Sequence, residues 1–149
     1  MRPMGTGAIL LVEDNPDDVA LTLRALKRNN IVNDVSHAQD GAEALEKLGE
    51  GSLPGEGPEL PALILLDLKL PKVDGLDVLR RIRADKRLKL LPVVILTSSK
   101  EQGDLIRGYD LGANGYVRKP VDFQQFAEAI KTLGLYWLVL NQAPPVAAN

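Results

Sequence analysis

Continuous apolar runs recur along the chain and mark its predicted strands. The clearest run covers residues 62–66, ends at Asp67, and is bracketed by Pro61 and Pro71. A run of five apolar residues suits a strand buried on both faces of a parallel sheet, because a buried helix would be longer. Further strands are predicted at 8–12, 92–97, more weakly at 31–38, and briefly at 116–119.

Between these runs, apolar residues recur with helical spacing. Helices are predicted from Asn15-Pro16 to Asn29-Asn30, over 41–48, from Asp74-Gly75 onward, around Leu105, Ile106 and Tyr109, and over 123–133. Asn15 and Asp74 are expected to cap helices, since their side chains can accept backbone N–H bonds. Five strands that alternate with five helices predict an α/β fold, a doubly wound parallel sheet with helices on both faces.

One long connection interrupts this alternation. Residues 49–61 contain four glycines and three prolines, and the segment is longer than most loops in compact domains. We expect a flexible excursion, with a recognition role as the alternative.

Composition narrows the possible functions. The chain has 149 residues, enough for one domain with its own core, and a formal net charge of −2, which argues against general nucleic-acid binding. It contains no cysteine, so disulfides and thiolate metal sites are excluded. No apolar stretch approaches the roughly 18 residues needed to span a bilayer. We therefore expect a cytoplasmic protein that binds neither nucleic acid nor membrane.

Polar residues that could bind a metal ion or take part in a reaction follow the ends of the predicted strands. The first strand leads to Glu13 and Asp14, the third to Asp67, the fourth to Thr97 and the fifth to Lys119. In a doubly wound sheet these strand ends share one rim, where ligands bind. Three carboxylates repel one another, and Mg²⁺ would relieve that repulsion while leaving positions for phosphate oxygens. The set describes a carboxylate nucleophile that accepts a phosphoryl group.

These motifs, in this order, resemble the receiver domain of two-component response regulators over about residues 8–133. The matching motifs are Glu13-Asp14, the apolar strand that ends in Asp67, Leu70-Pro71-Lys72-Val73-Asp74-Gly75, Thr97-Ser98 and Lys119-Pro120. The resemblance implies a flavodoxin-like (βα)5 fold with strand order 2-1-3-4-5, which brings Asp14 close to Asp67. It divides the chain into a tail at 1–7, a receiver domain at 8–133 and an extension at 134–149.

The resemblance also implies residue roles at the acidic site. Asp67 would be the phosphoacceptor, receiving a phosphoryl group from the phosphohistidine of a sensor histidine kinase. Mg²⁺ would be held by Glu13, acting through water, by Asp14 and Asp67, and by the main-chain carbonyl of Lys69. The Lys69 side chain stands two residues past the nucleophile, where it can influence attack by water. Such a protein catalyses only its own phosphorylation and dephosphorylation, and is otherwise a signalling protein and not an enzyme.

Other residues would sense the phosphoryl group. Lys119 would pair with it, and the bond from Lys119 to Pro120 is expected to be cis. Thr97 would hydrogen-bond a phosphoryl oxygen, and Tyr116 would turn inward, changing the surface formed by the fourth helix, fifth strand and fifth helix. His37, the only histidine, is expected to have a surface or packing role. The basic residues between positions 80 and 89 are typical of a solvated helix face.

The apolar segment 135–140 is too apolar to remain in water. It predicts a homodimer built on the fifth helix and residues 134–141. Leu133-Gly134-Leu135-Tyr136-Trp137 resembles the single-domain regulators that are paired with bacterial phytochrome kinases. With no output domain expected in 149 residues, the signal would leave through protein contacts or phosphate relay.

Three other functions compete with this one. A flavodoxin-like FMN carrier needs a hydroxyl-rich first loop, whereas Glu13-Asp14 would repel phosphate. A haloacid-dehalogenase-type phosphatase needs a general acid two residues after its nucleophile, where this chain has Lys69. A phosphorylation-independent interaction module remains the alternative, and it would bind no Mg²⁺ at the rim.

Overall fold

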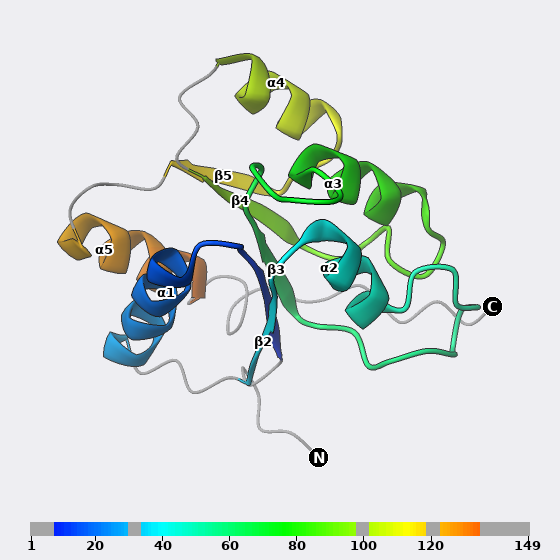
Figure 1. Ribbon diagram of the computed structural model, residues 1–149, viewed down its shortest axis with the longest axis horizontal. Helices are drawn as coiled ribbons and strands as arrows, with labels where there is room; N and C mark the ends of the chain where they lie inside the picture. Colours follow the sequence, from blue (N-terminus) through cyan, green and yellow to red (C-terminus); the bar gives the residue numbers. More distant parts are fainter. Residues whose placement is uncertain (1–7, 30–33, 98–101, 119–122, 135–149) are drawn as a thin grey trace.

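Five parallel strands form the centre of the molecule. The computed structural model describes residues 8–29, 34–97, 102–118 and 123–134. The strands are β1 (Ile9–Val12), β2 (Val35–Ala38), β3 (Leu63–Leu66), β4 (Val93–Thr97) and β5 (Gly115–Arg118). They pair in the order β2-β1-β3-β4-β5, with β1 and β3 side by side (Figure 1). The expected fold class and strand order are both confirmed.

Helices cover both faces of this sheet. One layer contains α1 (Pro16–Arg28) and α5 (Phe123–Gly134), which pack against each other, and the other contains α2 (Gly41–Leu48), α3 (Gly75–Ala84) and α4 (Gln102–Asp110) (Figure 1). Among the described residues, no helix combines the length and the apolar character that a bilayer crossing requires.

The strand β3 is apolar along its whole length because helices cover both faces of the sheet. Leu63 and Leu65 belong to the core beneath α1 and α5, while Ile64 and Leu66 belong to the core beneath α2 and α3. All four side chains are at most 2% exposed. Burial of each is worth about 1.5–3 kcal/mol, so a strand in this position must be apolar on both faces.

The helices begin where their capping residues predict. The Asn15 side chain accepts hydrogen bonds from the backbone N–H groups of Asp17 at 2.9 Å and Asp18 at 3.3 Å. The Asp74 carboxylate accepts one from Leu76 N–H at 3.3 Å. Both capping predictions are confirmed, and each cap starts its helix directly beyond the rim that carries the acidic residues.

The prediction of a solvated basic face on α3 is wrong for Arg83. Its guanidinium is half-buried and donates to the carbonyls of Gly112 at 2.7 Å and Leu91 at 2.8 Å, and to Asn114 Oδ1 at 2.9 Å. Burial lowers the pKa of Arg83 below its usual value. The planar fork of arginine therefore joins the loop before β4 to the loop after α4, which charge patterning cannot reveal.

The long loop expected to be a flexible excursion is anchored to the connection between α3 and β4. Gly51 N–H donates to Asp85 at 2.9 Å, the Glu50 carboxylate pairs with Arg81, and the Arg87 guanidinium donates to the carbonyls of Leu48 and Pro58. Gly49 starts the loop with φ +70°, a left-handed conformation that glycine adopts at no steric cost. These bonds hold the loop away from the acidic rim.

Candidate functional site

Backbone hydrogen bonds place Glu13 and Asp67 at the ends of neighbouring strands. Asp67 N–H donates to the Val12 carbonyl at 3.0 Å, one residue beyond the end of β3. Glu13 N–H donates to the Ala38 carbonyl at 3.0 Å, one residue beyond the end of β1. The sheet ladder therefore continues through both residues, and their positions are set by the register of three strands.

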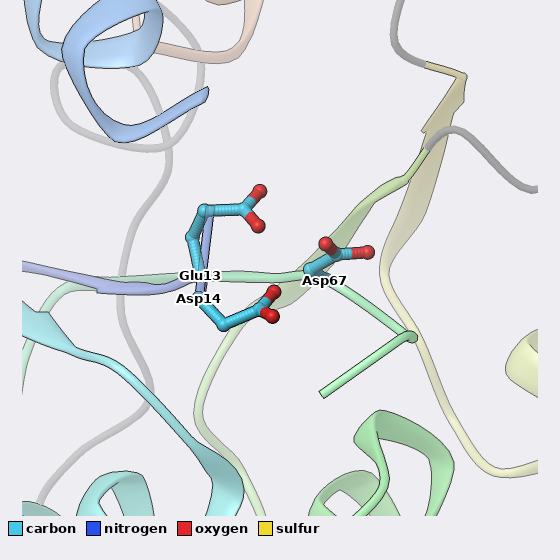
Figure 2. Close-up of side chains that lie close together, drawn as sticks. All are labelled: Glu13, Asp14 and Asp67. Atoms are coloured by element: carbon cyan, nitrogen blue, oxygen red, sulfur yellow. The ribbon is translucent and has the colours of Figure 1, made fainter. Parts of the chain in front are cut away.

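The side chains of Glu13, Asp14 and Asp67 form one cluster at this rim (Figure 2). A carboxylate oxygen from each lies within 4.8 Å of the others. Glu13 is only 2% and Asp67 only 7% exposed, whereas Asp14 is open to solvent. The cluster is therefore buried at its base and accessible on the side of Asp14.

Neighbouring backbone groups hold these carboxylates. Asn15 N–H donates to Glu13 Oε2 at 3.2 Å, and Lys69 N–H donates to Asp67 Oδ1 at 3.3 Å. His37 lies under the same corner, with its Nε2 at 2.7 Å from the Glu13 carbonyl oxygen. His37 was expected to have a surface or packing role, and its contact with the Glu13 backbone was not predicted.

The loop from β3 to α3 is packed too closely to move freely. A Cβ atom added to Gly75 would lie 2.3 Å from the Asp67 carbonyl oxygen, closer than any real contact. Lys72 adopts φ +67° and its ammonium lies 3.5 Å from the carboxylate of Asp40, the N-cap of α2. The strained Lys72 backbone and the Gly75 contact together fix the path of the chain after Asp67.

Two further predicted residues stand on neighbouring strands. Thr97 ends β4 and is fully buried. Tyr116, on β5, pairs with Ile95 of β4. The Tyr116 ring lies 6.5 Å, centroid to centroid, from the ring of Tyr109 on α4. Lys119 and its bond to Pro120 lie outside the described residues, as do the tail 1–7 and residues 135–149 of the extension.

Sequence reasoning missed Asp104, in the first turn of α4. This residue is 3% exposed, its Oδ1 accepts from Arg107 Nη2 at 2.5 Å, and its Oδ2 lies 3.7 Å from Lys69 Nζ. Acidic residues are common in the first turn of any helix, so the sequence carries no sign of its burial.

The acidic cluster suits a hard divalent cation. It offers only carboxylate oxygens, from three side chains within 4.8 Å, and one side is open for water or a phosphate oxygen. Sulfur and a complete cage of protein ligands, which zinc prefers in structural sites, are both missing from this cluster. The described residues thus fit Mg²⁺ or Mn²⁺.

The fold and this rim define the class of the protein. Residues 9–131 match the family model described as the response regulator receiver domain. The chain therefore belongs to the receiver domains of two-component response regulators.

Two individual relatives are similar to the chain over most of its length. The chain is 41% identical over 138 residues to a protein described as the probable methanogenesis regulatory protein FilR2 of Methanothrix harundinacea, covering 91% of this chain and 86% of that protein. It is 37% identical over 130 residues to response regulator Rcp1 of Synechocystis sp., covering 87% and 88%.

Several solved structures of similar regulators share the fold. The bacteriophytochrome response regulator RtBRR is 51% identical with a TM-score of 0.72, over 93% of this chain and 84% of that one. The phosphorylated cyanobacterial phytochrome response regulator RcpA is 37% identical with a TM-score of 0.82, over 93% and 99%. The Mn²⁺-bound form of Rcp1 is 35% identical with a TM-score of 0.81, over 93% and 99%.

Proposed function

We propose that this protein accepts a phosphoryl group on Asp67 from the phosphohistidine of a sensor histidine kinase, in a reaction that requires Mg²⁺. The observation that carries the proposal is the convergence of Glu13, Asp14 and Asp67 within 4.8 Å at the rim of the sheet. Asp67 is the central member, because its carboxylate follows the strand that lies between β1 and β4.

The chemistry is a transfer between two nucleophiles. An Asp67 carboxylate oxygen forms a bond to phosphorus while the bond from phosphorus to the kinase imidazole nitrogen breaks, and the imidazole leaves with the electron pair. A bound Mg²⁺ would supply positive charge to the phosphoryl oxygens. Glu13, Asp14, Asp67 and the Lys69 carbonyl would hold it, with Glu13 acting through water. Hydrolysis by water then returns Asp67 to its free carboxylate.

The properties of relatives support both parts of this proposal. The RcpA structure is that of a phosphorylated regulator, and one Rcp1 structure is of a Mn²⁺-bound form. Similarity to RtBRR and RcpA further favours a kinase of the phytochrome type as the phosphoryl donor. Within the cell, such a kinase and its regulator would meet in the cytoplasm.

Phosphorylation would be read out on the face formed by α4, β5 and α5. The added group carries about −1.5 to −2 charge and three acceptors. Thr97 would hydrogen-bond one acceptor and Lys119 would pair with the group, while Tyr116 would turn inward. Ile106 and Tyr109 expose 55% and 51% of their surfaces on α4, so a partner on this face would cover apolar area that Tyr116 adjoins.

A homodimer through α5 and residues 134–141 is also part of the proposal. It rests on the apolar residues at 135–140, and light scattering of the full chain tests it. A protein that remained monomeric at all concentrations would contradict the dimer without affecting the phosphoryl chemistry.

Acetyl phosphate provides the direct test of the phosphoryl transfer. Incubation with Mg²⁺ should add the mass of one phosphoryl group and change the fluorescence of Trp137, the only tryptophan. Asp67→Asn should abolish both responses, and chelation of Mg²⁺ should abolish them in the wild type. Asp34→Asn is the matched control, because Asp34 is an exposed carboxylate away from the rim.

No mass gain in the wild type, together with no response to beryllofluoride, would contradict the proposal. That outcome would favour a receiver-like module that binds its partner without phosphorylation.

A further inference from the structure

A chain of ion pairs connects the acidic rim to α4. Lys69 follows Asp67 by two residues, and its ammonium lies 3.7 Å from Asp104 Oδ2. Arg107, one helical turn after Asp104, donates to the other carboxylate oxygen at 2.5 Å. The loop after β3 and the first turn of α4 are therefore joined through one carboxylate.

The two partners of the ion pair between Lys69 and Asp104 differ in their exposure to solvent. The Asp104 side chain is 4% exposed, whereas that of Lys69 is 63% exposed. A buried carboxylate depends on cations and hydrogen bonds to balance its charge, so Asp104 attracts the Lys69 ammonium. Lys69 remains mobile enough to exchange partners, because most of its side chain is in solvent.

We infer that Asp104 is a positioning residue that holds the Lys69 ammonium on the α4 side of the loop, away from the phosphoryl group. This inference rests on the proposed function of Asp67. A phosphoryl group on Asp67 replaces the single carboxylate charge with a group that carries about −1.5 to −2, near the backbone of Lys69, and it competes with Asp104 for the ammonium. Asp104 therefore weakens the interaction between Lys69 and the phosphoryl group.

The coupling must act in both directions. If a phosphoryl group draws Lys69 away from Asp104, then the first turn of α4 loses one of its ties to the loop. A partner that stabilises a different position of α4 would likewise release Lys69 toward Asp67. Lys69 and Asp104 thus give the site an energetic connection to α4 that does not pass through Thr97 or Tyr116.

Calorimetric titration with beryllofluoride in saturating Mg²⁺ tests this role on the full chain. Asp104→Asn should tighten beryllofluoride binding by about threefold, the range expected for loss of a largely exposed ion pair. Arg107→Met should weaken binding, because Asp104 then attracts Lys69 more strongly. Both variants break the pair between Asp104 and Arg107, so a purely structural role would shift the affinity in the same direction in both.

The background variant Lys69→Met keeps the test valid even if Asp104→Asn reduces stability. In this background, Asp104→Asn should leave the affinity unchanged, whereas in Lys69→Arg its effect should return. An equal effect of Asp104→Asn with and without the Lys69 ammonium would overturn the inference. Wild-type protein that binds no beryllofluoride in an Asp67-dependent manner would instead contradict the proposed function itself.

Discussion

Replacing Asp67 with asparagine should stabilise the metal-free protein. The substitution removes one of three carboxylates whose oxygens lie within 4.8 Å of one another, and Asp67 is only 7% exposed. The amide keeps the size of the side chain and can still accept the N–H of Lys69, which lies 3.3 Å from Asp67 Oδ1. The substitution also removes the repulsion of the Asp67 carboxylate with Glu13 and Asp14.

The size of this repulsion follows from the separation. Two unit charges 4.8 Å apart repel by about 0.9 kcal/mol at the dielectric constant of water and by about 3.5 kcal/mol at an effective value of 20. Since the charged form also gains from its hydrogen bonds, we expect a net increase of about 1 kcal/mol in the free energy of unfolding. For a chain of this length the melting temperature should rise by about 2–4 °C.

Urea denaturation in EDTA and in Mg²⁺ measures both consequences. In EDTA the variant should be more stable than the wild type. Mg²⁺ at ten times its dissociation constant should stabilise the wild type by about 1.4 kcal/mol and the variant by much less. Asp34→Asn, which removes one exposed carboxylate outside the cluster, should change neither value appreciably.

A variant less stable than the wild type in EDTA would refute the reasoning. It would mean that the contacts of the Asp67 carboxylate stabilise the fold by more than the cluster repels it. An unchanged response to Mg²⁺ would show that the ion does not use this carboxylate.

Three other substitutions test contacts that hold the loops around the sheet. Gly75→Ala should lower the free energy of unfolding by about 1–3 kcal/mol and weaken Mg²⁺ binding, because its Cβ would lie 2.3 Å from the Asp67 carbonyl oxygen; urea melts and Mg²⁺ titration measure this. Arg83→Lys should cost about 1–3 kcal/mol in urea melts, since an ammonium cannot reproduce the bonds to Gly112, Leu91 and Asn114. A backbone N–H at the start of α2 holds the pKa of Asp40 below its usual 3.8, so this carboxylate stabilises the fold above that pH and loses the effect as pH falls through its folded-state pKa. Asp40→Asn should therefore lose less stability than the wild type between about pH 5 and pH 2. The midpoint of urea denaturation, measured at each pH, tests this.

A different result would contradict each of these three predictions. Gly75→Ala with unaltered stability would mean that the loop after Asp67 relaxes freely. Gly115→Ala is the control, because its Cβ would make only ordinary contacts, the nearest at 3.5 Å from the Val94 side chain. An Arg83→Lys variant as stable as the wild type would show that a point charge suffices there. Identical acid profiles for Asp40→Asn and wild type would assign the acid sensitivity to other carboxylates.

Several features could be predicted because they depend on neighbours in the sequence. The apolar run before Asp67 indicates a strand buried on both faces, and the caps at Asn15 and Asp74 depend on N–H groups two or three residues away. The acidic rim follows from these elements together, because parallel strands place all their carboxyl ends on one edge.

Other features depend on residues far apart in the chain. Arg83 looked like part of a solvated face, yet it is half-buried because the loops at Leu91 and Gly112 fold against it. Asp104 looked like an ordinary acidic residue in a first helical turn, yet the packing of α4 buries it beside Lys69. Periodicity and caps record only the contacts of a residue with its own segment. The partner of a long, charged side chain is decided when helices and loops from distant segments close over it, because only then is it removed from water.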